Sequence, residues 1–348
     1  MFSKAYTKNL FTKKEQLESM PRVLYHYCGF DTGMKILSGK KIWLSHVTKM
    51  NDPHELGYII PIVTEAIKKV ILYYNNKFEF ATPIDVEGAY SFEEKYVNEY
   101  SKMIYAVCFS ENTELVDQWT RYADHARGMA IGFSTFPLVK MQTDRTSFAF
   151  GKVVYGGDYL CNEIKDIIIN TYEDQKSRKQ AQQSYVSNES LKIDLYDIFA
   201  NCFKAYIECA YLFKHPTFSQ EREWRLVFNP YMRIRGIVDM SSARDLLHDA
   251  QEESKYPIGF IKSEFKYRCI HNSDITSYIE LDFSQINREL IKEVILGAQT
   301  TCQAIDSDMY EFMKNNGYSL SNITSSFLGD RTFIHKSTIP YQSYKRFE

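Results

Sequence analysis

Short apolar runs, bounded by glycine, proline or polar clusters, recur along the chain and predict β-strands. The runs at 103–110 and 128–133 are apolar at nearly every position, which is typical of strands buried on both faces. The other expected strands cover 22–28, 42–44, 148–155, 224–228, 261–269, 277–283 and 291–297. Strands are therefore expected from the start of the chain to near its end.

Helical periodicity separates these strands. Apolar residues at helical spacing predict helices over 31–39, 55–76, 115–122 and 301–315, and a largely helical region over 158–213. Asp31 is placed to cap the first helix. Before the second helix, Asp52 can act as the cap while Pro53 takes the first helical position; lining a pocket is the alternative role for the neighbouring Asn51 and His54. This mixture of elements predicts an α+β fold.

The order of the elements suggests a core interrupted by helices. A polar stretch, 174–188, lies in the middle of the helical region, and we expect it to be exposed. The expected segments are an N-terminal arm (1–21), the first part of the core (22–157), a helical insertion (158–213), the second part of the core (214–300) and a C-terminal helix and tail (301–348).

The stretch from Ser219 to Phe228 combines an apolar strand with several charges. Because a strand alternates its faces, we expect Glu221, Glu223 and Arg225 to point to one side. Two like charges beside a tryptophan are costly unless they are compensated, and one arginine compensates only one of them. The stretch is therefore either a surface ion pair at the start of a strand or a functional acidic site.

Composition narrows the class of protein. The net charge of −2 argues against a general nucleic-acid or membrane binder, which would carry a basic surplus. The seven cysteines are scattered without a C-x-x-C pair, which is the usage of a reducing compartment and predicts no metal site. No apolar run is long enough for a signal peptide or a membrane span. We expect a soluble cytoplasmic protein.

Side chains suited to nucleotide chemistry lie on the predicted strands. His26 can bind a ribose hydroxyl, rings between Tyr105 and Tyr122 can stack on a flat base, and Glu223 can stabilise an oxocarbenium-like centre. Each of these residues also has a structural interpretation. A lone histidine on a β-strand, or a pair such as Trp119 and Tyr122 at helical spacing, can belong to the hydrophobic core.

Several motifs together resemble the bacterial domain-of-unknown-function 2971 family, over roughly residues 22–300. These motifs are Leu24-Tyr25-His26-Tyr27, Trp43-Leu44-Ser45, Asn51-Asp52-Pro53-His54-Glu55, Cys108-Phe109-Ser110 with Gln118, Trp119 and Tyr122, Gly128 to Phe133, and Glu221-Arg222-Glu223-Trp224-Arg225. The name of this family says nothing about function.

A more distant resemblance links the chain to histidine-type ADP-ribosyltransferases, including bacterial DNA-modifying toxins. Tyr25-His26 followed by a helix is similar to their opening, and Glu221-Arg222-Glu223 resembles the E-x-E motif of the arginine-type branch. The resemblance implies a split antiparallel or mixed β-sheet and NAD as the substrate. Tyr27 stands where many transferases carry glycine.

The same resemblance implies roles for individual residues. His26 would bind the nicotinamide ribose, Glu223 would hold its 2′-hydroxyl, and Glu221 would activate an acceptor. The implied NAD-binding set also includes Tyr27, Tyr105, Phe109, Ser110, Trp119, Tyr122 and Arg225, in which Tyr105, Phe109, Trp119 and Tyr122 are alternatives for stacking on nicotinamide.

The leading hypothesis is an enzyme that cleaves NAD at the nicotinamide–ribose bond and passes ADP-ribose to a protein, RNA or DNA acceptor, or to water. It requires His26 and Glu223 to face one cleft. The alternatives are a non-catalytic NAD or nucleotide sensor and a metal-independent nuclease that uses the same two residues.

Overall fold

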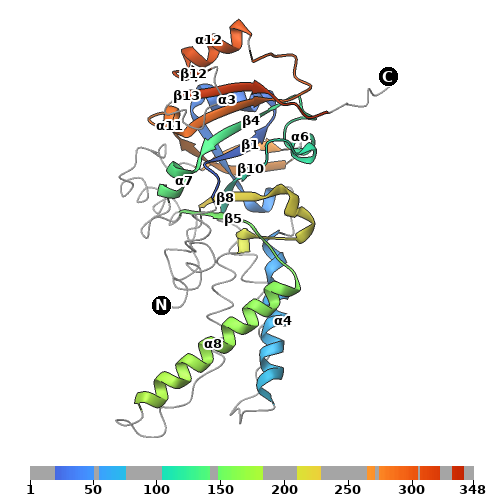
Figure 1. Cartoon of the computed structure of the whole chain (residues 1–348), viewed down its shortest axis with the longest axis vertical. Coiled ribbons are helices and arrows are strands. Elements are labelled where there is room, and N and C mark those ends of the chain that lie inside the picture. Colours follow the sequence, from blue (N-terminus) through green and yellow to red (C-terminus); the bar gives the residue numbers. More distant parts are fainter. Residues whose placement is uncertain are drawn as a thin grey trace, which may run out of the picture. The chain divides into compact units, whose positions relative to one another are not determined.

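The computed structural model describes residues 20–50, 55–75, 104–141, 148–182, 210–228, 265–270, 274–304, 306–321 and 331–340. The chain divides into two compact units. One comprises residues 1–17, 51–102 and 154–218, and the other comprises 18–50, 103–153 and 219–348. The first is called the helical unit and the second the sheet unit (Figure 1).

The sheet unit is built on one mixed sheet, which has 11 strands among the described residues. The strands are β1 (Val23–Cys28), β2 (Lys41–His46), β3 (Tyr105–Ser110), β4 (Met129–Ser134), β5 (Phe148–Lys152), β8 (Glu223–Phe228), β9 (Lys266–Ile270), β10 (Asp274–Asp282), β11 (Ile291–Leu296), β12 (Ser319–Ser321) and β13 (Arg331–Lys336). Their main order is β12-β13-β11-β4-β1-β3-β2-β10-β9, with β8 joining β3 to β5. Among the described strands of this sheet, only the pairs that involve β13 are parallel.

Short helices connect these strands. They are α3 (Phe30–Gly39), η1 (Val47–Lys49), α6 (Val116–Arg121), α7 (Thr135–Met141), η5 (Pro216–Glu221), α11 (Asn287–Leu290) and α12 (Ser307–Asn315). Among the described residues, no helix is both long enough and apolar enough to cross a membrane.

Strand β3 has three strand neighbours, and this divides the sheet. It pairs with β8 along its whole length, from Tyr105 to Ser110. It also pairs with β1 at Ser110 and with β2 at Tyr105 and Ala106. Because a strand has only two edges and β8 occupies one, β1 and β2 both pair with the other edge of β3. Strand β1 pairs at the Ser110 end and β2 at the Tyr105 end, so the two strands diverge from each other.

The register of the strands assigns their side chains to two faces, since directly paired residues share a face. Glu223 pairs with Ser110, Ser110 with Tyr25, Tyr25 with Gly132, and Gly132 with Glu293. We call the face with these residues the acid face. The opposite face, called the histidine face, carries His26, Phe109, Ile131 and Trp224 and continues into a cluster of phenylalanines (Phe109, Phe133 and Phe283).

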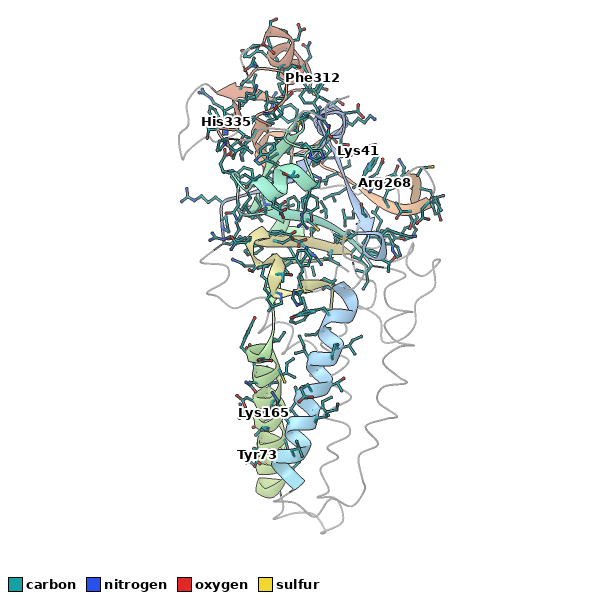
Figure 2. All side chains as sticks on the ribbon, turned by 90° about the vertical axis from the view of Figure 1, so that its right-hand side faces the viewer. Lys41, Tyr73, Lys165, Arg268, Phe312 and His335 are labelled. Carbon is teal, nitrogen blue, oxygen red and sulfur yellow. The ribbon has the colours of Figure 1, made fainter. Side chains whose placement is uncertain are left out.

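The helical unit contains two long helices, α4 (Glu55–Asn75) and α8 (Asp158–Gln182), which contact each other and spread apart toward the bottom of Figure 1 (Figures 1 and 2). The buried positions recur at helical spacing on each helix. They are Ile59, Val63, Ala66 and Val70 on α4, and Leu160, Ile164, Ile168 and Tyr172 on α8. The same unit includes β6 (Val154–Tyr155), which pairs in parallel with β7 (Phe213–Lys214), and η4 (Ala210–Leu212).

The structure confirms an α+β fold with a mixed sheet, and it corrects several details. Helix α3 begins at Phe30 with Gly29 as its N-cap, and Asp31 lies in the first turn rather than at the cap. Helix α12 begins at Ser307 rather than at 301. Strands β12 and β13 lie in the segment expected to be a helix and tail. The roles predicted for Asn51, Asp52, Pro53 and His54, and residues 183–209 of the expected insertion, lie outside the described residues.

The burial pattern of α8 predicts where a protease cuts first. Among the residues of α8 whose burial is described, Tyr172 is the last buried one, and Glu173, Asp174 and Ser177 after it are exposed. Trypsin should therefore cleave after Lys176, Arg178 or Lys179 before it cleaves after Lys165, because the end of a helix opens more easily than its packed part. Mass spectrometry of the first fragments checks this. A first cut after Lys165, on the packed part of the helix, would contradict it.

Candidate functional site

Strand β8 carries a buried ion pair. Glu223 and Arg225 are two residues apart and therefore share a face, and they are only 5% and 1% exposed. Arg225 donates from Nε to Glu223 Oε1 at 2.7 Å and from Nη2 to Oε2 at 3.0 Å. This two-bond geometry is the strongest form of arginine–carboxylate contact, and it holds Glu223 in one orientation.

Glu221 is positioned by a different element. It is the last residue of η5, and Arg222 between it and β8 has a positive φ of 43°. The strand alternation predicted for Glu221, Glu223 and Arg225 thus applies only to Glu223 and Arg225. Glu221 is also buried, and its Oε1 accepts a hydrogen bond from the Tyr122 hydroxyl at 3.3 Å.

The end of β3 joins both acids. Ser110 pairs with Glu223 across the strands, and its hydroxyl donates to the Glu221 carbonyl at 2.7 Å. The loop after Ser110 is held to the same place, because Asn112 donates from Nδ2 to the Gln220 carbonyl at 3.1 Å. Ser110 and its loop therefore fix the main chain of the segment that carries the two acids.

Helix α6 and the turn after it pack on the acid face. Trp119 is fully buried and contacts Tyr27 edge to face, with 5.1 Å between ring centroids. These two rings form a core cluster with alanines and isoleucines of the sheet and the turn, against which Tyr25 and Tyr122 are partly buried. Trp119 is thus a core residue, whereas Tyr122 is half-buried beside Glu221.

The turn after α6 has an unusual backbone. Asp124, His125 and Ala126 have positive φ values of 46°, 53° and 61°, a left-handed conformation that costs side-chain-bearing residues energy. Close backbone contacts hold it. A Cβ on Gly297 would lie 2.2 Å from the Ala126 carbonyl oxygen, so only glycine fits beside the turn there. This docking fixes the position of Tyr122.

A second polar cluster lies on the acid face, and the sequence analysis did not predict it. The Tyr25 hydroxyl donates to Glu293 Oε2 at 2.6 Å, and His335 Nδ1 lies 3.5 Å from Glu293 Oε1. Burial raises the pKa of Tyr25, and the hydrogen bond to Glu293 raises it further, so its hydroxyl remains a donor. The only signal in the sequence is the charge of Glu293 within an apolar strand.

The prediction that His26 and Glu223 face one cleft is wrong. The register assigns His26 to the histidine face, where its ring lies 6.1 Å from the Phe109 ring, and Glu223 to the acid face. Tyr105 and Phe109, two of the four stacking candidates, are buried on the histidine face as well.

His26 has a structural contact at the point where β1 leaves β3. Its Nδ1 lies 2.9 Å from the Cys108 carbonyl oxygen, so Nδ1 carries the proton and donates. Burial lowers the pKa of His26, although the hydrogen bond to Cys108 partly opposes this. A neutral His26 thus links β1 to β3 beyond the single pair of Tyr25 and Ser110.

The structure therefore brings together only part of the predicted set. The residues that share the acid face and its cover are Tyr27, Ser110, Trp119, Tyr122, Glu221, Glu223 and Arg225; His26, Tyr105 and Phe109 do not belong to this group. Within the described ranges, no three histidine, cysteine, aspartate or glutamate side chains are grouped as a metal site would require.

A model of the family described as protein of unknown function (DUF2971) matches residues 118–226, which include most of α6, the left-handed turn and the segment from Glu221 to Arg225. The predicted resemblance to this family is thus confirmed over that part of the chain. No curated protein and no solved structure matches.

Breaking the buried ion pair should destabilise the fold. Glu223→Gln and Arg225→Gln should each lower the free energy of unfolding by about 3–5 kcal/mol, because each leaves one buried charge unpaired. The double variant should lose less than the sum of the two single losses. Urea denaturation of the four proteins measures this coupling, and additive losses would show that the two side chains act independently.

His26 should make the fold sensitive to acid. Because burial lowers its pKa in the folded protein, the unfolded chain takes up the proton first. The stabilising contribution of His26 is complete at pH values above its pKa in the unfolded chain, about 6.5. Below that pH, the free energy of unfolding should fall by up to about 1.4 kcal/mol per pH unit. Urea denaturation at several pH values checks this; His26→Gln should flatten the profile, and an unchanged slope would contradict the argument.

Proposed function

We propose that the acid face cleaves NAD at the nicotinamide–ribose bond and transfers ADP-ribose to a macromolecular acceptor or to water. The observation that carries this proposal is the pair of buried acidic residues, Glu221 and Glu223, which lie two residues apart in the chain. Ser110 pairs with Glu223 and donates to the Glu221 carbonyl, and the half-buried Tyr122 donates to the Glu221 side chain. The E-x-E spacing of these acids supports it through the resemblance to the arginine-type branch.

Cleavage of the nicotinamide–ribose bond requires a fixed negative charge close to C1′ of the ribose. When the C1′–N bond breaks, its electron pair leaves with nicotinamide and positive charge develops on the ribose. The cationic partner Arg225 favours the ionised form of Glu223, which stabilises that charge. The acceptor hydroxyl or water then attacks C1′, and Glu221 takes its proton.

His26 has no catalytic role in this proposal, which therefore differs from the enzyme expected from the sequence, in which His26 and Glu223 had to face one cleft. The histidine-type arrangement needs the imidazole next to the glutamate, and here the sheet separates them. Tyr122 is the stacking ring, because Trp119, Tyr105 and Phe109 are all buried in packed clusters or on the other face. The proposed site therefore follows the E-x-E branch rather than the histidine branch.

A second candidate is a non-catalytic NAD or nucleotide-binding module. Both oxygens of Glu223 are hydrogen-bonded to Arg225, and the carboxylate is almost inaccessible to solvent. A carboxylate held in this way can stabilise the strand that supports a binding surface, or it can act electrostatically on a reaction. The two candidates differ in whether nicotinamide is released.

Glu221→Gln is the sharpest variant for this question. Glutamine keeps an acceptor for the Tyr122 hydroxyl and leaves the Glu223–Arg225 pair intact, so the protein should fold. Loss of the acceptor-activating base should lower transfer to an acceptor by about a hundredfold or more while NAD binding is kept. Chromatography of released nicotinamide, mass increments on protein, RNA and DNA, and NAD affinity measure these quantities on one preparation.

His26→Gln is the matched control, because it removes an imidazole of the predicted set that lies outside the proposed site. Its turnover per folded molecule should equal that of the natural protein. A specific loss of turnover in this variant would contradict the proposed site. NAD binding without nicotinamide release in the natural protein would favour the binding module. Absence of NAD binding would overturn the proposed NAD cleavage, and absence of binding to NAD and to other nucleotides would overturn both candidates.

A further inference from the structure

Strands β2, β9 and β10 carry a cluster of cations and rings at the end of the sheet that β9 closes. Lys41, Lys266 and Arg268 lie on two of these strands, and Figure 2 labels Lys41 and Arg268. The register places Ser45 opposite Ala106 and opposite Tyr278, and Tyr278 opposite Lys266. The cluster therefore belongs to the acid face, four strand spacings of about 4.8 Å each from β8.

Arg268 is held in place by a ring and a hydroxyl. Its guanidinium lies over Trp43, with 5.2 Å to the ring centroid, and its Nη2 donates to Ser45 Oγ at 3.0 Å. Trp43 is supported in turn by Tyr278, with 4.4 Å between the ring centroids. A guanidinium stacked on an aromatic ring keeps its charge and presents its N–H groups at the edge of the plane.

The same guanidinium has an unsatisfied donor. Arg268 Nε is buried and is the one buried side-chain nitrogen or oxygen without a hydrogen-bond partner among the described residues. Burial lowers the pKa of Arg268, and the only group that opposes this shift is Tyr278, which is not a carboxylate. An unmatched buried donor on a cation is costly, and it is a group that an oxyanion would satisfy.

The nearby charges leave an excess of positive charge. Glu280 accepts a hydrogen bond from Lys266 at 2.6 Å and lies 3.6 Å from Lys41. Burial alone would raise the pKa of Glu280, but the contacts with the two lysines lower it, so this carboxylate stays ionised and engaged by them. Arg268 remains the cation of this cluster without a carboxylate partner among the described residues.

We propose that Arg268, fixed by Trp43 and Ser45, binds the phosphate group of a phosphate ester. Arginine binds phosphate through paired N–H bonds, and Lys266 and Lys41 add attraction at longer range. The ester is either a free nucleotide or a single-stranded nucleic acid; the net charge of −2 favours the smaller ligand. The proposal goes beyond NAD cleavage and does not depend on it.

The experiment compares the full-length protein with Arg268→Met and with the control Arg288→Met. Methionine keeps much of the packing volume against Trp43 but removes the charge, while Arg288 is an exposed arginine whose Nε donates to the Gly317 carbonyl. Calorimetric titrations use pyrophosphate and AMP, and fluorescence anisotropy uses a short single-stranded oligonucleotide at several salt concentrations. None of these assays needs NAD or turnover.

Arg268→Met should weaken binding of the phosphate ligand about tenfold or more, and Arg288→Met should leave it unchanged. If nucleic acid is the source, the oligonucleotide should bind more tightly than AMP, and Arg268→Met should reduce the salt slope by about one. Arg268→Lys keeps the charge but not the paired N–H groups of the guanidinium. Its affinity for the phosphate ligand should lie between those of the natural protein and of Arg268→Met, and it replaces the methionine variant if that variant does not fold. Equal affinities in all variants, or no binding of any probe, would overturn the proposal.

Discussion

A buried ion pair in β8 constrains the surrounding sheet. Desolvating a carboxylate and a guanidinium costs several kcal/mol for each ion, and only good geometry with both hydrogen bonds offsets that cost. The pair of Glu223 and Arg225 meets this condition within one strand, because their two-residue spacing places both side chains on the same face. The strand can therefore be buried along its whole length between β3 and β5 without leaving a charge unmatched.

The split at β3 explains why the acids and His26 are separated. Strand β1 pairs with β3 at Tyr25, not at His26, so Tyr25 shares the face of Glu223 and His26 takes the other. Where β1 then leaves β3, the imidazole replaces a main-chain contact by donating to the Cys108 carbonyl. A residue that sequence similarity suggests as a ribose ligand is thus used to join two strands.

The sequence predicted the elements well, because apolar runs and turn residues are local signals. It could not predict which residues of different strands share a face, since a register shift of one residue reverses every assignment. The local argument also failed at Glu221, because the positive φ of Arg222 ends the strand before that residue. The contact between Tyr25 and Glu293 joins residues far apart in the chain, and β13 is too polar to be recognised as part of the sheet.

Two arginines on one face of the same sheet show how burial and partners determine what a cation can do. Arg225 donates from Nε and Nη2 to the two oxygens of Glu223, so its charge is neutralised by a carboxylate that it also orients. Arg268 lies over an aromatic ring, which stabilises the cation without neutralising it, and its Nε has no acceptor among the described residues. The first arrangement suits stabilisation of positive charge that develops in a reaction, and the second suits recognition of an anion. A ligand that carries both a glycosidic centre and phosphates would meet complementary groups at two places on this face.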